Sequence, residues 1–173
     1  MKNLIYFLPL SLLTILFTGC NKSEVDEAWR EANGNYYEQI KQNPEYEELK
    51  TATGPTGVYR KRLEGDTILV KQYPLQTSSV KVLYLGKYYD GTVFDEGSGT
   101  TIPTEFNLTG GNVIRGFSFA LQQMCVGNRW EIVIPYYLGY GESGLVSDYT
   151  TLIEGYTTLV FEVELVEIIR YPQ

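Results

Sequence analysis

The chain has 173 residues, 43% of them hydrophobic and 14% aromatic, a length that fits one domain with an extension. Its net charge of −7, with no basic stripe to offset it, argues against nucleic acid as a partner. The sequence has no histidine and two distant cysteines, which excludes a histidine-based catalytic triad, a histidine-ligated metal site and a cysteine metal cluster. We therefore expect no metal and no cofactor.

The first twenty residues have the pattern of an export signal. Lys2 gives a basic start, and an apolar run from Leu4 to Phe17, short for a membrane-spanning helix, is followed by small residues and Cys20. The ending resembles a bacterial lipobox, in which residues 1–19 are removed and Cys20 becomes the lipid-bearing first residue. An uncleaved anchor and an ordinary secretory signal are the alternatives. With Cys20 lipidated, Cys125 has no partner, so we predict no disulfide.

Residues 23–52 are predicted to be helical. Ser23 and Asp26 have the spacing of a capping box, and Trp29 belongs to one apolar face. The segment 33–35, Asn-Gly-Asn, should interrupt the helix, and Pro44 should stop it after the pattern resumes. Trp29 and the tyrosines after it are expected to pack within the extension or onto the domain, with a partner-binding or dimerising helix as the alternative. The turn residues 53–57 separate this extension (20–56) from the domain (57–172).

From residue 57 onward, alternation of apolar and polar side chains predicts strands. The expected strands before the next helix are residues 58–63, 67–73, 80–85 and 104–108. Asp90-Gly91, between two aromatic stretches, indicates a hairpin.

Residues 110–127 have the spacing of a short helix. The apolar residues step by three or four and so share one face: Val113, Ile114, Phe117, Leu121 and Met124. Gly110 and Gly111 break the chain before this helix, and Gly127 is placed to end it. A lone helix this short needs a cover for its apolar face, which the neighbouring strands must supply.

Alternation resumes at residues 130–134 and ends at Pro135. Residues 136–156 are predicted to be a long loop, which in a compact domain is usually functional or mobile. Residues 158–165 are the clearest strand, with one apolar side made of Leu159, Phe161, Val163 and Leu165. The predicted object is one curved sheet round one helix, with an aromatic-lined hollow at their ends.

A set of short motifs follows in a fixed order between residues 57 and 169. They are Tyr84-x-Gly86, Asp90-Gly91-Thr92-Val93-Phe94-Asp95, Val113-Ile114-Arg115-Gly116-Phe117, Gln123-Met124-x-Val126-Gly127, Ile134-Pro135, Leu138-Gly139-Tyr140-Gly141 and Thr158-Leu159-Val160-Phe161-Glu162-Val163-Glu164-Leu165. In this order they resemble the FKBP-type peptidyl-prolyl isomerases, and with the lipobox the chain resembles the bacterial lipoproteins of that family. The resemblance implies an α+β, FKBP-like fold: a curved antiparallel sheet wrapped round one short helix, after an N-terminal helical extension.

The resemblance also implies an aromatic pocket that receives a proline ring. Tyr140 would hydrogen-bond a substrate carbonyl, Asp95 would face Tyr84 and the twisted bond, and Phe117 would be the floor. These four are the implied catalytic residues, and the implied substrate-binding residues are Phe94, Phe106, Val113, Ile114, Ile153 and Phe161. Any one of them alone would fit an ordinary core or turn position. Two positions depart from the family pattern. Thr104 stands where relatives often have Phe, although Phe106, two residues on, should point to the same face of the strand. Thr100 stands near a place where some relatives have Arg.

Prolyl isomerisation breaks amide resonance against a barrier of about 18–20 kcal/mol but breaks no covalent bond, so it needs neither nucleophile nor metal. The first hypothesis is an isomerase of the bacterial cell envelope, anchored through lipid on Cys20, on the outer membrane facing the periplasm. Its partners would be Xaa-Pro-containing polypeptides of exported proteins, with the family's macrolides as candidate ligands and the oligomeric state left open.

The second hypothesis is a catalytically weak binding module. It would hold unfolded chains or an envelope partner through the loop 142–152 and the extension. Deleting residues 21–56 is expected to impair such binding while sparing catalysis on a small peptide.

Overall fold

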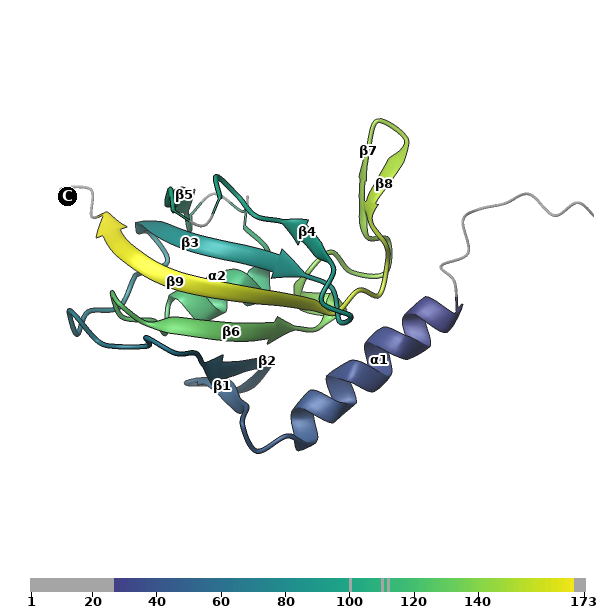
Figure 1. Ribbon diagram of the computed structural model, residues 1–173, viewed down its shortest axis with the longest axis horizontal. Helices are drawn as coiled ribbons and strands as arrows, with labels where there is room; N and C mark the ends of the chain where they lie inside the picture. The colour runs from purple at the N-terminus through teal and green to yellow at the C-terminus, as the bar shows by residue number, and fades with distance from the viewer. Residues whose placement is uncertain (1–26, 100, 110, 112, 170–173) are drawn as a thin grey trace, which may run out of the picture.

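The computed structural model of the protein describes residues 27–99, 101–109, 111 and 113–169 (Figure 1). Its elements in chain order are α1 (Glu27–Gln42), β1 (Glu47–Thr51), β2 (Gly54–Arg62), β3 (Ser79–Lys87), β4 (Val93–Asp95), β5 (Thr104–Asn107), α2 (Arg115–Leu121), β6 (Arg129–Ile134), the 3-10 helix η1 (Tyr136–Leu138), β7 (Leu145–Ser147), β8 (Thr150–Ile153) and β9 (Leu159–Ile169). Neither α-helix in these ranges combines the length and apolarity that crossing a membrane requires.

The main sheet has seven strands, in the order β1-β2-β6-β9-β3-β4 with β5 also paired to β3. All of its pairs are antiparallel. Phe161 of β9 lies opposite Ile132 of β6 on one side and opposite Gly86 of β3 on the other. β7 and β8 form a separate hairpin that projects from the body of the molecule (Figure 1).

Helix α2 packs against one face of this sheet and closes the main core. Phe117, Ala120 and Leu121 of the helix are buried in the same cluster as alternate residues of β9, namely Leu159, Phe161, Val163 and Leu165. Fully burying one such apolar side chain contributes about 1.5–3 kcal/mol. The predicted α+β fold, a curved antiparallel sheet round one short helix, is therefore confirmed.

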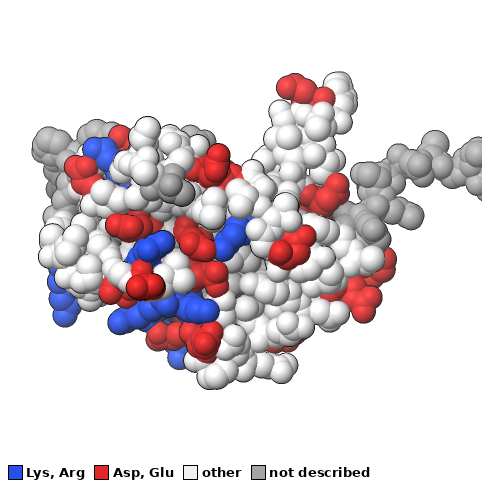
Figure 2. Space-filling view, viewed as in Figure 1, with Lys and Arg blue, Asp and Glu red and all other residues white. Residues whose placement is uncertain are grey.

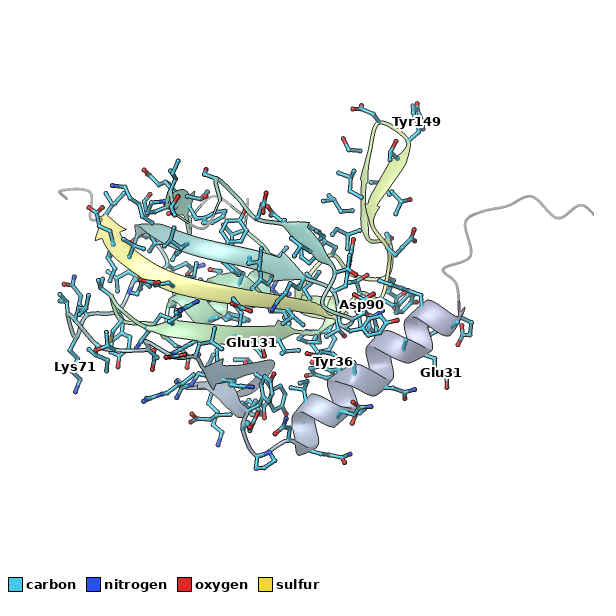
Figure 3. All side chains as sticks on the ribbon, in the orientation of Figure 1. Glu31, Tyr36, Lys71, Asp90, Glu131 and Tyr149 are labelled. Atoms are coloured by element: carbon cyan, nitrogen blue, oxygen red, sulfur yellow. The ribbon has the colours of Figure 1, made fainter. Side chains whose placement is uncertain are left out.

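Helix α1 covers the opposite face of the sheet. Side chains along a strand alternate between its two faces. Val133 and Val160 accordingly point away from the main core and pack with Ile40 of α1 in a second cluster. Tyr36 and Tyr59 pack against this cluster. The predicted packing of the extension onto the domain is confirmed, and Figure 3 shows Tyr36 between α1 and the sheet.

Charged side chains of both signs gather on the part of this outer face that α1 leaves open (Figure 2). Lys87 Nζ lies 2.5 Å from Glu162 Oε1 and 3.8 Å from Glu131 Oε2. Arg60 pairs with Glu47 across β1 and β2 at 2.5 Å. The outer face therefore has an aromatic area under α1 and a solvated, charged area beside it.

The predicted extent of the N-terminal helix is wrong in two places. The helix does not break at the Asn-Gly-Asn segment 33–35, because Asn33 is fully buried and hydrogen-bonded to the domain. It ends at Gln42, before Pro44 as expected, but residues 47–51 are strand β1 and not helix. The sheet thus begins ahead of residue 57, and the proposed division of the chain into domains remains a prediction. Ser23 and the expected cap lie outside the described residues.

Three further expectations are corrected. Residues 67–73 form no strand; Val70 makes an isolated bridge with Val126. Gly127 does not end α2, which closes at Gln122, although Gly127 does have a positive φ of 92°. Residues 136–156 are not a plain loop, because they contain η1 and the β7–β8 hairpin.

Candidate active site

Aromatic rings from five elements meet beside α2. Phe117 of α2 and Phe161 of β9 are buried and lie with ring centroids 5.0 Å apart, edge to face. Tyr84 of β3 lies 6.1 Å from Phe117, Phe106 of β5 lies 5.8 Å from Phe117, and Phe94 of β4 lies 5.6 Å from Phe161. The last three rings are half-buried. We call the two buried rings the floor of the candidate site and the half-buried rings its walls.

The missing side chain of Gly86 allows two of these rings to meet. A Cβ at this position would lie 2.8 Å from Phe94 Cζ and 3.0 Å from Phe161 Cε1. Both distances are shorter than carbon atoms tolerate without moving apart. Gly86 is thus required by the close approach of the rings.

The polar part of the site is a tyrosine–aspartate pair at the edge of the cluster. The Tyr84 hydroxyl lies 3.0 Å from each carboxylate oxygen of Asp95 and donates to this carboxylate. The backbone N–H of Gly97 donates to Asp95 Oδ1 at 3.0 Å. Gly97 has a positive φ of 57°, and a Cβ there would meet the Tyr84 ring at 2.6 Å, so glycine fits both the turn and the ring.

The two tyrosines near Asp95 remain protonated at neutral pH. Burial, then the hydrogen bond to Asp95 and its negative charge raise the pKa of Tyr84. Burial, followed by the charge of Asp95, raises the pKa of Tyr140. Each phenol is therefore held as an O–H donor.

The remaining predicted residues surround the same cluster. Val113 and Ile114 lead into α2 and are half-buried against the main core, as is Tyr140 just after η1. Ile153, at the end of β8, is 4% exposed and belongs to that core. Backbone bonds from Gly141 N–H to the Tyr136 carbonyl and from Tyr156 N–H to the Gly141 carbonyl fix the loop that carries Tyr140. Cys20 lies outside the described residues.

Tyr88 is a wall residue that sequence reasoning gave no role. Its ring centroid lies 5.0 Å from that of Phe94, and its hydroxyl donates to the Leu152 carbonyl at 3.3 Å. It thereby links the hairpin before β4 to the strand that carries Ile153. The sequence signal was the aromatic pair 88–89 directly before the Asp-Gly turn.

The arrangement supports binding and electrostatic chemistry. Its buried rings exclude water, and the Tyr140 hydroxyl can donate to a carbonyl oxygen. Within the described ranges no three histidine, cysteine, aspartate or glutamate side chains group as a metal site would need. The chemistry available here is the stabilisation of one conformation of a bound group over another.

Comparison with known proteins gives a consistent family. The family model described as FKBP-type peptidyl-prolyl cis-trans isomerase matches residues 71–166. The FKBP-type 22 kDa peptidyl-prolyl cis-trans isomerase of Escherichia coli is 47% identical over 96 residues, which cover 56% of this chain and 44% of the relative. The Bos taurus peptidyl-prolyl cis-trans isomerase FKBP2 is 42% identical over 125 residues, which cover 70% of this chain and 86% of the relative.

A solved structure agrees with this result. The peptidyl-prolyl cis-trans isomerase from Pseudomonas syringae pv. tomato superposes with a TM-score of 0.67 at 34% identity, covering 83% of this chain and 96% of that one. The chain spans less than half the length of the Escherichia coli relative but most of the other two.

Proposed function

The chain belongs to the FKBP-type peptidyl-prolyl cis-trans isomerase family and is an isomerase of that class, and we propose that it acts on Xaa-Pro bonds of exported polypeptides from a lipid anchor. The observation that supports action on Xaa-Pro bonds is the hydrogen-bonded pair of Tyr84 and Asp95 at the edge of a buried aromatic floor. This pair joins an apolar binding surface to fixed polar groups.

The rings act by favouring the twisted amide over the planar one. Twisting the prolyl bond costs about 18–20 kcal/mol in water because it breaks amide resonance. The planar amide is the more charge-separated form, so moving it from water onto Phe117 and Phe161 penalises it more than the twisted form. Proline itself contacts the walls, for which we propose Phe94, Phe106, Val113, Ile114 and Ile153.

Tyr140 supplies the hydroxyl that contacts the substrate. The Tyr84 proton is already donated to Asp95, whereas the Tyr140 hydroxyl has no hydrogen bond to any other described residue. A substrate carbonyl beside Tyr140 would therefore receive a hydrogen bond without breaking one within the protein. Asp95, facing Tyr84, would hold its negative charge near the twisted bond.

The deciding experiment is the cis-to-trans rate of a short Xaa-Pro peptide, measured with residues 21–173 made without lipid. We expect wild type to accelerate the reaction and Tyr140→Phe to lose about tenfold in kcat/KM, since it removes one hydrogen bond to the substrate. Tyr149→Phe is the matched control, because Tyr149 is fully exposed at the tip of the β7–β8 hairpin (Figure 3). A folded wild-type protein without acceleration would contradict the proposal.

The cellular location rests on the first twenty residues. A basic start, an apolar run and Thr18-Gly19-Cys20 support removal of residues 1–19 and lipid on Cys20, as in bacterial FKBP-type lipoproteins. We propose the outer membrane, with the domain in the periplasm. Metabolic labelling with a radioactive fatty acid should then label the full wild-type chain and leave full-length Cys20→Ser unlabelled.

A second candidate function is the binding of unfolded chains through the β7–β8 hairpin. Val146, Tyr149 and Leu152 of this hairpin are more than half exposed. Asp148 and Tyr149 at its tip have positive φ angles of 48° and 64°, an uncommon conformation for such residues. This function predicts that Tyr149→Ser impairs the refolding of a long proline-containing protein and leaves the isomerisation rate of the short peptide unchanged.

Macrolides of the kind that the family binds are candidate ligands of the aromatic site.

A further inference from the structure

We propose that helix α1 is a positioning element of the active site and that Trp29 is the residue through which it holds two walls of that site. This inference rests on the proposed function, because it concerns the geometry of the same site. It also replaces the expectation that deleting residues 21–56 would spare catalysis on a small peptide. That deletion removes α1 and also strand β1 from the main sheet.

The first wall is held by a continuous series of ring contacts. Trp29 lies edge to face with Tyr88, with ring centroids 5.4 Å apart, and at 5.5 Å from Tyr89. Tyr88 packs on Phe94 at 5.0 Å, and Phe94 packs on Phe161 at 5.6 Å. Aromatic pairs of this kind contribute about 0.5–1.5 kcal/mol beyond the area that they bury. A ring of the extension thus supports the hairpin whose Phe94 borders the site.

The second wall is held by hydrogen bonds. Trp29 Nε1 donates to Thr157 Oγ1 at 3.1 Å, and the Thr157 hydroxyl donates to the Glu154 carbonyl at 2.6 Å. Thr157 is 3% exposed, so these groups have little water to replace a lost partner. Glu154 directly follows Ile153, the buried residue at the end of β8. Trp29 therefore stabilises the turn 154–157, which directly follows Ile153.

The position of Trp29 along the sheet is fixed by the next turn of α1. Asn33 Oδ1 accepts the backbone N–H of Thr158 at 2.9 Å, and the Thr158 hydroxyl donates to the Asn33 carbonyl at 3.2 Å. Asn33 Nδ2 donates back to the Trp29 carbonyl at 2.9 Å. Asn33 and Thr158 are both buried, so a sliding helix would leave several polar groups unpaired. α1 therefore has one register on the domain.

A purely stabilising role for α1 makes a different prediction, and the helix offers the control for it. Ile40 lies on the same helix and is 5% exposed, but it packs with Val133 and Val160, away from the site. Ile40→Ala should lower stability through the lost packing without reaching Tyr88 or Thr157. Comparing Trp29→Ala with Ile40→Ala separates positioning from stability.

The test measures kcat/KM on a short Xaa-Pro peptide at a temperature where each variant is folded. We expect Trp29→Ala to lose about fivefold or more relative to Ile40→Ala, and Trp29→Phe to recover part of that loss by restoring ring contacts. Amide hydrogen exchange should speed up at residues 88–94 and 154–158 in Trp29→Ala and stay unchanged there in Ile40→Ala.

Equal kcat/KM and equal exchange in Trp29→Ala and Ile40→Ala would overturn the proposal. Should Trp29→Ala not fold, Thr157→Val becomes the deciding variant. A Thr157→Val protein with the kcat/KM of wild type and unchanged exchange at 154–158 would overturn the proposal. If wild type itself is inactive on the peptide, the result contradicts the proposed function and not the role of α1. The exchange pattern would still report whether α1 holds the two walls.

Discussion

Asp95 is an exposed carboxylate that is nevertheless held in place. It accepts the Tyr84 hydroxyl and the Gly97 N–H, so its orientation is set by one strand and by the turn that follows it. A hydrogen bond to a charged group is worth about 1.5–3 kcal/mol when protected from water, and less when exposed. The pair therefore has more consequence for geometry than for stability.

Tyr84 and Asp95 should behave as one unit in catalysis. We expect Tyr84→Phe and Asp95→Ala each to lower kcat/KM about tenfold and the double variant to lose little more, because either change frees the other partner. The measurement is a double-mutant cycle on a short Xaa-Pro peptide, with urea unfolding to show that the variants stay folded. If the fold-losses in kcat/KM of the two single variants multiply in the double variant, the two side chains act independently.

Most residues that the motifs indicated lie together beside α2, as their fixed order predicts, but the sequence could not assign all of their contacts. Phe106 fills the expected place, with its ring 5.5 Å from Tyr84. Thr104 instead serves the neighbouring turn, where its hydroxyl accepts the Ser98 N–H at 3.3 Å. Tyr88 has only a weak sequence signal, because Trp29, the ring that supports it, is distant in the chain. Thr100 lies outside the described residues.

At the scale of elements, α1 shows how tertiary contacts override local propensity. The Asn-Gly-Asn segment disfavours a helix, yet Asn33 gains three hydrogen bonds only if the helix continues through it. The residues of β1 carry no clear strand pattern, because β1 is a mostly polar edge strand in which Leu49 is the buried residue. Its identity depends on pairing with β2, which local patterning does not specify.

Asn33 should be the strongest single anchor of the extension. We expect Asn33→Ala to lower the free energy of unfolding by roughly 2 kcal/mol, since it leaves the buried Thr158 N–H without its acceptor. Asn35→Ala is the matched control, because Asn35 is an exposed asparagine on the same helix. Urea unfolding measures both, and equal losses in the two variants would contradict the assigned role.

At the scale of the whole molecule, two aromatic layers lie on opposite faces of one sheet. The inner layer is the candidate site, and the outer layer joins α1 to β2 and β6. Tyr37 donates to the Gly57 carbonyl at 2.7 Å, and its ring lies edge to face with Tyr59 at 5.9 Å. Tyr46 donates to Glu131 of β6. Family motifs contain the residues of the inner layer, whereas the outer layer depends on contacts between distant segments that no local pattern encodes.

The outer layer makes stability sensitive to alkaline pH. Burial is the largest cause that raises the pKa of Tyr36, Tyr37, Tyr46 and Tyr59 above the ordinary value of 10.0. The folded state therefore binds these protons more tightly than the unfolded state does. Their contribution to stability is fully present below pH 10.0 and is lost as pH rises through the higher folded values.

We therefore expect the urea midpoint to fall between about pH 9 and pH 11, beyond any change seen between about pH 7 and pH 9. Lysines act in the same direction; the hydrogen bond to Glu45, for example, raises the pKa of Lys61. The part of the alkaline loss of stability that is due to tyrosines therefore needs its own control. Tyr46→Phe keeps the ring but cannot ionise, and it should show a smaller alkaline loss than wild type. Tyr149→Phe, at a fully exposed position, should retain the wild-type loss. An equal alkaline loss in Tyr46→Phe and wild type would mean that proton release from the outer layer does not govern how α1 is held.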